Sequence, residues 1–276
     1  MAEAHYCPED RTSSVTSKDV GHRMRHVTQA TIDELNHADQ AFAGNRLLST
    51  FSREERALLE PFGELVELES GDVVLRSGEQ VRSTLFPVGP TMISLTGELS
   101  GGRSAEVASI GREGAVGGIV SCGHAPAYSL AEVLVPGRGF RVPLEAIEDS
   151  KKRSPFISNL FCRFSDYLLA QVMQSVVCNA FHSIPERAAR WLLLAQDRAG
   201  DRIELTQEAF AGLLGVQRTT MNAVIQQLSS EGLIATRRGK ILLTDRAGLK
   251  RRACECYQRL EDHFGAVIGT TGRGAA

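Results

Sequence analysis

Apolar residues recur at helical spacing in two short segments near the C-terminus, separated by a glycine. Phe210, Leu213 and Leu214 share one side of the first segment. Thr206 precedes it as an N-cap, and Gly215 follows as the residue that most easily adopts a positive φ after a helix. The second segment has its apolar positions at Met221, Val224, Ile225 and Leu228. The pattern predicts a helix, a tight turn and a second helix.

The polar side of the second helix differs from an ordinary solvated helix surface. It carries the hydrogen-bonding residues Gln217, Arg218, Thr219, Asn222 and Gln226. Carboxylates are absent from Ala209 to Ser230, although solvated helices usually carry Glu and Lys together. Such a face suits a helix that lies against phosphates.

A short hairpin follows the second helix, between Leu233 and Leu243. Arg237, Arg238 and Lys240 place three cations around its turn, where a wing would rest on a DNA backbone. We therefore interpret Ile203 to Thr244 as a winged helix-turn-helix.

The first half of the chain has a different pattern, in which short apolar runs alternate with turn residues. A helix pair comes first, with a capping box formed by Ser52 and Glu55. The predicted strands are Leu65 to Leu68, Val73 to Leu75, Thr84 to Pro87, Thr91 to Leu99, Ala105 to Ile110, Tyr128 to Leu134 and Gly139 to Val142. This spacing predicts a sandwich or barrel of the jelly-roll kind.

One long helix is predicted between these two regions, from Ser154 or Pro155 to about Ala180. Its apolar stripe consists of Ile157, Phe161, Phe164, Leu168, Val172 and Val176, widened by Leu160, Tyr167 and Leu169. A stripe this broad predicts packing on the barrel and on a second copy of the chain. The alternative is a helix buried only within its own chain. A further helix begins at Ile184 and Pro185, so we place a hinge near residue 180.

The predicted fold class is α+β: a jelly-roll-like β-barrel, a long dimerisation helix and a C-terminal winged helix-turn-helix. The expected boundaries are a disordered or weakly helical extension (1–43, with Met24 as an alternative start), the barrel (44–153), the dimerisation helix (154–180), the winged helix-turn-helix (181–265) and a flexible tail (266–276).

The charge is distributed unevenly along the chain. The formal net charge is −2, yet residues 181–260 hold 13 Lys and Arg against 8 Asp and Glu, and the remainder holds 18 against 25. A basic C-terminal module on an acidic body suits local contact with DNA. No apolar run is long enough for a membrane span, and the N-terminus lacks an export signal, so we expect a cytoplasmic protein whose six cysteines are reduced.

These elements, in this order, resemble the Crp/Fnr superfamily of bacterial transcription regulators over about residues 45 to 265. The matching phrases are SGDVVLRSGEQ, LFPVG and GREGAVGG in the barrel, then IPERAARWLLLAQDR, LTQEAFAGLLGVQRTTMNAVIQQLSSEGLI and RRGKILLTDRAGLKRRACECY. The resemblance implies a cyclic-nucleotide-binding-like barrel and a homodimer that places two recognition helices in successive major grooves of double-stranded DNA. RNA polymerase is a further expected partner.

The resemblance also suggests roles for individual residues. Arg218 stands where the family's base-reading arginine lies, and arginine binds guanine O6 and N7 with two hydrogen bonds. Thr206 and Thr220 match phosphate-contact positions. The positions that carry Glu and Arg in well-known members are Thr219 and Ala223 here, so the half-site preference should differ. The predicted DNA-binding residues are Thr206, Gln217, Arg218, Thr219, Thr220, Asn222, Arg237, Arg238 and Lys240.

The barrel shows no sign of the effectors common in the family. Cyclic-AMP-binding members carry an Arg-Ser pair after the glycine-rich loop, where this chain has Ala125-Pro126-Ala127, and Glu113 precedes the glycines instead of following them. A cyclic phosphate would lack its cation there. We read Arg112 as a surface or turn residue.

The cysteines do not suggest a cofactor either. An Fnr-type iron–sulfur cluster needs several N-terminal cysteines, and only Cys7 is present there; a haem would have to rely on Cys122 or His124. Cys254 and Cys256, with His263, form a weak metal candidate, because two thiolates two positions apart on a helix point in different directions. Cys162 and Cys178 are read as buried small residues, with a thiol switch at the dimer interface as the alternative. No cofactor and no metal are therefore expected.

The sequence predicts a sequence-specific DNA-binding transcription regulator. It shows no nucleophile–base motif and no attached catalytic domain, so an enzyme is not expected. The alternative is a ligand-binding or protein-interaction module with a degenerate winged helix.

Overall fold

The computed structural model describes residues 38–101, 104–119, 125–237 and 239–269. Predictions that concern Cys7, Met24, Cys122, His124 and Arg238 lie outside the described residues. Within the described ranges, no helix combines the length and the apolar character needed to cross a lipid bilayer.

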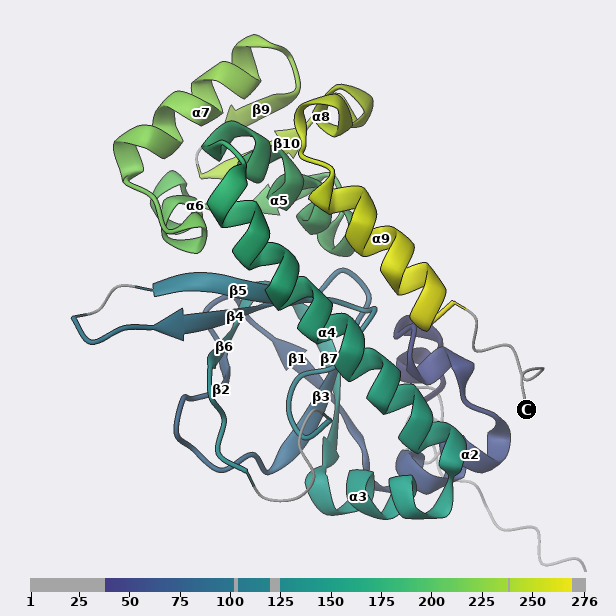
Figure 1. Cartoon of the computed structure of the whole chain (residues 1–276). Helices are drawn as coiled ribbons and strands as arrows, with labels where there is room; N and C mark the ends of the chain where they lie inside the picture. The colour runs from purple at the N-terminus through teal and green to yellow at the C-terminus, as the bar shows by residue number, and fades with distance from the viewer. Residues whose placement is uncertain (1–37, 102–103, 120–124, 238, 270–276) are drawn as a thin grey trace, which may run out of the picture.

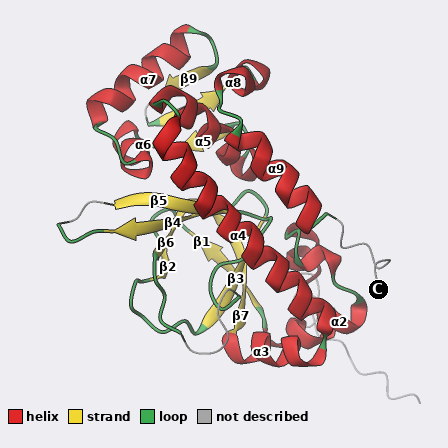
Figure 2. Cartoon of the chain, in the orientation of Figure 1, coloured by secondary structure: helices red, strands yellow, loops and turns green. Residues whose placement is uncertain are grey.

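The N-terminal half is a sandwich of two antiparallel sheets (Figures 1 and 2). One sheet has the strand order β1–β7–β3 and the other the order β2–β6–β4–β5. The strands are β1 Glu64–Leu68, β2 Val73–Leu75, β3 Ser83–Val88, β4 Met92–Glu98, β5 Ser104–Ile110, β6 Leu130–Val135 and β7 Gly137–Pro143. All seven predicted strands are present. The described strands form two separate sheets and no closed barrel, which is compatible with a jelly roll.

The helical segments before β1 belong to the core of the sandwich. They comprise a helix over residues 38–44, η1 Leu48–Thr50, α2 Arg53–Leu59 and η2 Glu60–Phe62. The predicted capping box is present, since Ser52 Oγ accepts from the Glu55 amide and Glu55 Oε2 accepts from the Ser52 amide. The predicted boundary at residue 43 was misplaced, because Ala41 and Phe42 are fully buried. The Phe42 ring packs against Phe140 with centroids 5.7 Å apart.

Two helices follow the sandwich. The first, α3 Leu144–Arg153, was not predicted. The second is the predicted long helix, α4 Pro155–Phe181, in which Ser154 Oγ accepts from the Ile157 amide as an N-cap. The first half of α4 buries its apolar side chains, including Phe161 and Phe164, in the sandwich core. The second half leaves large apolar side chains exposed.

The C-terminal half is a helical domain with a small three-stranded sheet of order β8–β10–β9. Its elements are α5 Ile184–Ala199, β8 Arg202–Glu204, α6 Gln207–Leu214, α7 Arg218–Ser230, β9 Ile234–Arg237, β10 Lys240–Leu243, α8 Arg246–Arg252 and α9 Cys256–Val267. Trp191 of α5 and Phe210 of α6 pack with ring centroids 4.9 Å apart and form part of its core.

The last helix, α9, leaves this domain and runs beside α4 back to the sandwich (Figure 1). Phe264 and Ile268 are buried in the sandwich core, where the Phe264 ring packs edge-on against Tyr167 with centroids 4.9 Å apart. The Arg46 guanidinium lies 4.2 Å from the centre of the same ring. The prediction ended the winged helix domain at residue 265 and began a flexible tail there. Instead, Ile268 is buried in the core of the sandwich.

The two domains are also joined by a buried ion pair. The Arg198 Nε of α5 donates to Glu113 Oε1 over 2.7 Å, and both side chains are almost inaccessible to solvent. Met92 of β4 also joins the two domains, because its side chain packs in the apolar core of the C-terminal domain. The helix-turn-helix is therefore held directly against the sandwich.

Candidate nucleic-acid interface

The helix-turn-helix forms as its sequence predicts. Thr206 Oγ1 caps α6 by accepting from the Ala209 amide over 3.1 Å. Gly215 ends the helix with a φ of 66°, in the left-handed region that glycine enters at little cost. The Val216 amide then donates to the Ala211 carbonyl, which closes the turn before α7. The relative direction of the two helices is thus fixed by local backbone bonds.

Helix α7 has the two faces that the pattern indicates. Its four predicted apolar residues are buried in the core of the domain. Gln217, Arg218 and Thr219 are exposed at its start, and Thr220 and Asn222 are partly exposed. The side chain of Gln217 makes no capping bond, although Gln217 occupies the N-cap position. The structure thus places all five predicted residues of this helix in one neighbourhood that solvent reaches.

Arg218 is the first residue of α7, and its side chain is 71% exposed. The nearest carboxylate oxygen, Glu208 Oε2, lies 3.8 Å from its Nη1, and Glu208 is more exposed still. That distance is too long for a hydrogen bond, and exposed ion pairs contribute little free energy. The guanidinium is therefore free to exchange this neighbour for a base edge.

The predicted wing is present as β9 and β10, with Lys240 opposite Arg237 and Gly239 in the turn at a φ of 76°. Arg237 is exposed, as a phosphate contact would require. Lys240 differs from the prediction in one respect: its Nζ bonds to Glu204 on the neighbouring β8. That carboxylate occupies part of the cation's bonding capacity, so Lys240 is less available to a phosphate than Arg237.

The wing and the start of α6 enclose a shallow groove of about 130 Å³. Gln207 lies on the α6 side of the groove, and Arg237 and Lys240 lie on the wing side. Free backbone amides at a helix N-terminus attract anions, as do cations. Because Thr206 uses its oxygen lone pair for the cap, its hydroxyl hydrogen is available to a phosphate oxygen.

Arg202 is a further exposed cation of this surface that the sequence did not reveal. It lies on β8, in the same small sheet as the wing, and its guanidinium approaches Glu204 at 3.4 Å. A strand of three residues is too short to show a strand period. In the sequence, only the alternation of Ile203 and Leu205 with charged neighbours indicated a strand at this position.

The glycine-rich turn of the sandwich serves close packing. Gly117 and Gly118 have φ values of 84° and 65°, and a Cβ on either would lie within 2.7 Å of an oxygen of β3. A Cβ on Gly114 would lie 2.4 Å from the Phe164 ring of α4. Arg112 is exposed, as predicted. Glu113 is buried and bonds to Arg198.

The cysteines are arranged differently from the prediction. Cys254 lies in the loop before α9 and Cys256 is the first residue of that helix, so the two do not share one helix. His263 is occupied elsewhere, with its Nε2 3.0 Å from Asp166 Oδ2. Cys178 is buried as predicted, but Cys162 is exposed.

A comparison with known protein families matches residues 186–252 to the Crp-like helix-turn-helix domain. A stretch of 71 residues, or 25% of the chain, is 38% identical to the HTH-type transcriptional regulator Cmr of Mycobacterium tuberculosis (strain CDC 1551 / Oshkosh). The match spans 28% of that regulator. The family match lies in the helix-turn-helix half of the chain.

Solved structures extend the likeness of fold to both halves. FixK2 from Bradyrhizobium japonicum superposes with a TM-score of 0.60 at 16% identity, over 70% of this chain and 98% of that one. A CRP/FNR-family transcriptional regulator from Thermus thermophilus superposes with a TM-score of 0.54 at 23% identity, over 69% and 98%.

The fold and the surface around α7 define a protein with a β sandwich attached to a winged helix-turn-helix. Residues 186–252 match the Crp-like helix-turn-helix domain, and the fold as a whole is like that of solved Crp/Fnr-family regulators.

Proposed function

We propose that the protein is a sequence-specific DNA-binding transcription regulator, which binds a two-fold-symmetric operator as a homodimer. The observation that carries this proposal is the position of Arg218, at the exposed first turn of a helix whose outward face holds no carboxylate. Recognition helices read bases mainly from their N-terminal residues. Arg218 is the base-reading residue in this proposal.

The neighbours of Arg218 supply further contacts to bases and backbone. Gln217 and Asn222 carry amides that can pair with adenine N6 and N7. Thr206, Arg237 and the groove beside them would bind phosphates, which fix the register of a protein on the duplex. Thr219 and the small Ala223 stand on the same exposed side, which supports an operator different from those of relatives with charged residues there.

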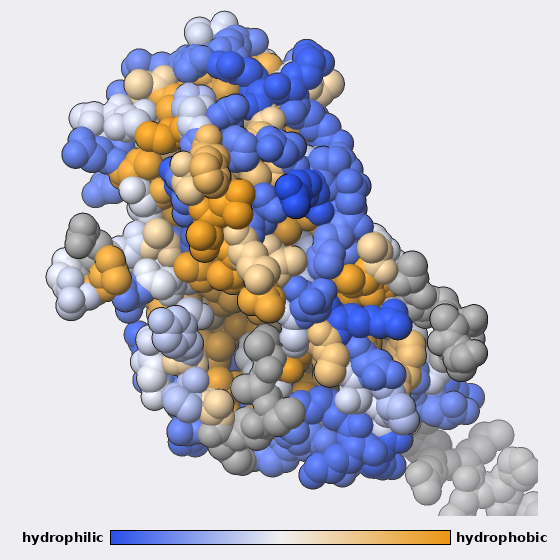
Figure 3. Space-filling model, viewed as in Figure 1, coloured by the Kyte–Doolittle hydropathy of each residue, from blue (hydrophilic) through white to orange (hydrophobic). Residues whose placement is uncertain are grey.

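The second half of α4 supports a homodimer. Five large apolar side chains are exposed along it: Leu169, Met173, Val177 and Phe181, each four residues from the next, and Val176 beside Val177. They form a continuous apolar strip over this helix in Figure 3. Spacing of this kind suits a seam between two parallel helices. A second copy of the chain is the occupant we propose, because it would bring two α7 helices onto one duplex.

The sandwich is proposed to respond to something other than cyclic AMP. Gly117 and Gly118 of its glycine-rich turn lie so close to β3 that a larger residue would not fit there. Their presence is therefore explained without a bound phosphate. Residues 119–128 contain neither lysine nor arginine, and a cyclic phosphate needs such a cation. RNA polymerase is the proposed further partner of the DNA-bound dimer, on the strength of the family alone.

Selection of bound duplexes from a random pool, followed by binding at several salt concentrations, tests the proposal. The wild-type protein should enrich a palindrome whose affinity falls steeply with salt. Arg218→Ala should lose about 1–3 kcal/mol of discrimination at one base pair per half-site while remaining the same oligomer. Arg153→Ala, which removes an exposed cation of α3, is the matched control and should bind normally.

Two results would contradict the proposal. If Arg218→Ala selected the same palindrome as the wild type, the base-reading role would be wrong. If the wild-type protein bound no duplex even at low salt, the winged helix would be a protein-interaction module instead.

A further inference from the structure

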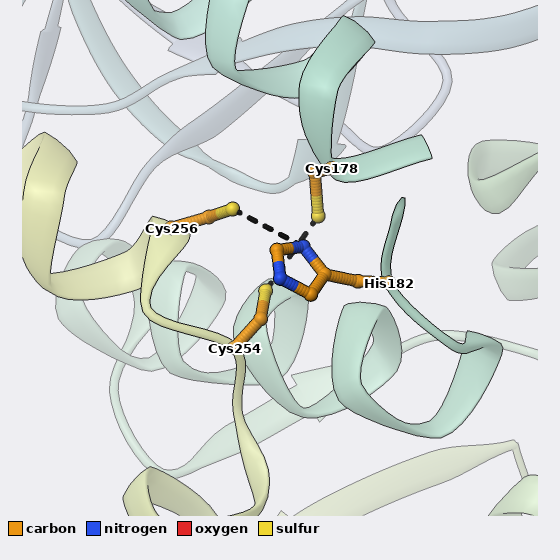
Figure 4. Close-up of side chains that lie close together, drawn as sticks. All are labelled: Cys178, His182, Cys254 and Cys256. Atoms are coloured by element: carbon orange, nitrogen blue, oxygen red, sulfur yellow. Dashed lines mark hydrogen bonds between the residues drawn. The ribbon is translucent and has the colours of Figure 1, made fainter. Parts of the chain in front are cut away.

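Four metal-binding side chains converge at the hinge between α4 and α5. They are Cys178, in the last turn of α4, His182, which directly follows that helix, and Cys254 and Cys256, at the junction of α8 and α9. Their ligand atoms all lie within 4.8 Å of one another. Figure 4 shows the three sulfur atoms gathered around the imidazole of His182.

The spacing within the cluster fits a single ion. Cys178 Sγ lies 3.6 Å from Cys254 Sγ, and Cys256 Sγ lies 3.4 Å from His182 Nδ1. A tetrahedral zinc ion, with bonds of about 2.3 Å to sulfur and about 2.0 Å to nitrogen, would separate two sulfurs by about 3.8 Å and sulfur from nitrogen by about 3.5 Å. The Cys178–Cys254 and Cys256–His182 distances are thus close to the ligand–ligand distances around a tetrahedral zinc ion.

The local backbone explains why these side chains meet. Cys178 and His182 are four residues apart, so they lie on one face of the helix end, and the His182 amide still donates to the Cys178 carbonyl. Helix α8 ends at Arg252, and α9 begins at Cys256. Between them Ala253 is extended, with a φ of −72° and a ψ of 149°, so Cys254 and Cys256 are not held at helical spacing and their sulfurs can meet.

The surroundings of the cluster resemble the outer shell of a metal site. His182 Nε2 lies 3.1 Å from Glu255 Oε2, so a proton on Nε2 leaves the Nδ1 lone pair facing the three thiols. Ligating histidines usually pair their second nitrogen with such a carboxylate. The Gln174 amide donates to Cys256 Sγ over 2.9 Å, as an outer hydrogen bond to a thiolate would.

The charges nearby favour an anionic centre. Arg187 and Arg190 of α5 are close enough for their positive charges to act on Cys178. Arg190 is only 7% exposed, and its Nε is buried with no hydrogen-bond partner among the described residues. Three thiolates and a neutral imidazole around a divalent ion carry one net negative charge. That negative charge would help to compensate the buried guanidinium of Arg190.

We propose that Cys178, His182, Cys254 and Cys256 form a Cys₃His site for a single Zn²⁺ ion. Thiolate-rich sets of four ligands with tetrahedral spacing are the usual structural zinc sites of proteins. The ion would join the end of α4 to the α8–α9 junction across the hinge at Ser183. It would therefore set the direction in which the helix-turn-helix leaves α4. The inference does not depend on DNA binding.

Metal analysis of the full-length protein tests the site. The chain, purified under a thiol-free reductant and without oxygen, should hold one Zn²⁺ per chain. Cobalt(II) added to the apoprotein should give the intense thiolate-to-metal charge-transfer absorption and the visible bands of a tetrahedral complex. Cys178→Ser and Cys254→Ser should each remove about one third of the charge-transfer intensity. Both should also weaken zinc binding more than about 100-fold.

Two further variants separate loss of the site from loss of the fold. Cys162→Ser changes the exposed cysteine of α4 and should keep the full zinc content. Glu255→Gln keeps all four ligands and changes only an exposed side chain, and it should weaken zinc binding by about 10–100-fold. Zinc affinity is measured in each case by competition with a chromogenic chelator.

The zinc site has clear contrary outcomes. It is ruled out if the reduced wild-type chain takes up no zinc or cobalt at micromolar concentrations, or if the chain is isolated with iron. It is also ruled out if mass spectrometry finds a Cys178–Cys254 disulfide that re-forms after reduction in the presence of zinc. None of these results bears on whether the helix-turn-helix binds an operator, so the two proposals can fail separately.

Discussion

The Trp191 indole of α5 donates a 2.8 Å hydrogen bond from Nε1 to Glu106 Oε1 on β5. The other oxygen of the same carboxyl accepts from Ser94 Oγ over 2.8 Å. The contact joins the sandwich to α5, the first helix of the helix-turn-helix half. Because Trp191 is the sole tryptophan of the chain, its fluorescence reports directly on whether the two halves are in contact.

This contact should make domain docking depend on pH. Burial raises the pKa of Glu106 from 4.5 to about 7, although the bonds from Ser94 and Trp191 and the charges of Arg198 and Arg190 oppose the rise. Between those two pH values the unfolded chain ionises Glu106 while the folded chain keeps it protonated. The contribution of this group to stability is therefore full below pH 4.5 and is lost as the pH rises through 7. The loss is at most on the order of 3 kcal/mol.

Thermal melts of wild type and Glu106→Gln, followed by tryptophan fluorescence, check this prediction. The amide oxygen can still accept from the indole but does not titrate, so the variant should lose the fall in Tm between about pH 5 and pH 7. Glu67→Gln, which neutralises an exposed carboxylate of β1, is the control and should follow the wild type. Equal slopes in Glu106→Gln and wild type would show that Glu106 does not govern the effect.

The buried pair of Glu113 and Arg198 should be strongly coupled. Glu113→Ala leaves the Arg198 guanidinium buried without its carboxylate, which should cost about 3–5 kcal/mol in the free energy of unfolding. The double variant Glu113→Leu with Arg198→Met removes both charges and should be more stable than Glu113→Ala. Urea unfolding measures the stability of the wild type and of both variants, and a double variant less stable than Glu113→Ala would contradict a coupled pair.

A charge in the exposed strip of α4 should prevent association. Met173 is 61% exposed in the single chain, so Met173→Glu should fold normally and yet place two carboxylates in the seam of the proposed dimer. Light scattering after gel filtration should give a dimeric wild type and a monomeric variant. Lys152→Glu, an exposed change on α3, should remain dimeric. If the Met173→Glu variant were still a dimer, the dimer interface would not be the exposed strip of α4.

The two described wing cations should contribute unequally to DNA binding. Arg237 is exposed, whereas Lys240 is bonded to Glu204. Arg237→Ala should lower the slope of log affinity against log salt by about 0.9, the value for one phosphate contact. Lys240→Ala should lower it less. The double variant Lys240→Ala with Glu204→Gln tests whether the bond to Glu204 explains the small effect of Lys240. Because it removes one positive and one negative charge, its affinity for DNA should be near that of the wild type.

Much of this architecture was predictable because local rules determine it. The helix-turn-helix depends on a Thr cap, a left-handed Gly and an apolar period of three and four, which all act within a few residues. The strands were equally predictable from alternation and turn residues. Helix α3 was missed because it follows β7 directly, and its lysines and acids obscured the apolar positions Leu144 and Ile147.

The hinge cluster lay beyond sequence reasoning for a different reason. Cys178 and Cys254 are separated by 76 positions, and their meeting depends on the packing of α8 against α5 and of α9 against α4. The prediction treated Cys254 and Cys256 as two thiols on one helix and paired them with His263. The chain is not helical at Ala253, so the two cysteines do not lie on one helix. The histidine beside Cys256 is His182 and not His263. Lys240 is a similar case, because its partner Glu204 lies on a strand too short to predict.

The return of α9 to the sandwich has a consequence for the order in which the protein is made. Phe264 and Ile268 occupy the same core as Phe42 and Phe140, although they are among the last described residues to leave the ribosome. A sandwich synthesised first cannot bury those positions until α9 has been translated. The core of the N-terminal half should therefore remain incomplete until then, and nascent chains shortened before Phe264 should be more sensitive to protease than chains that include α9.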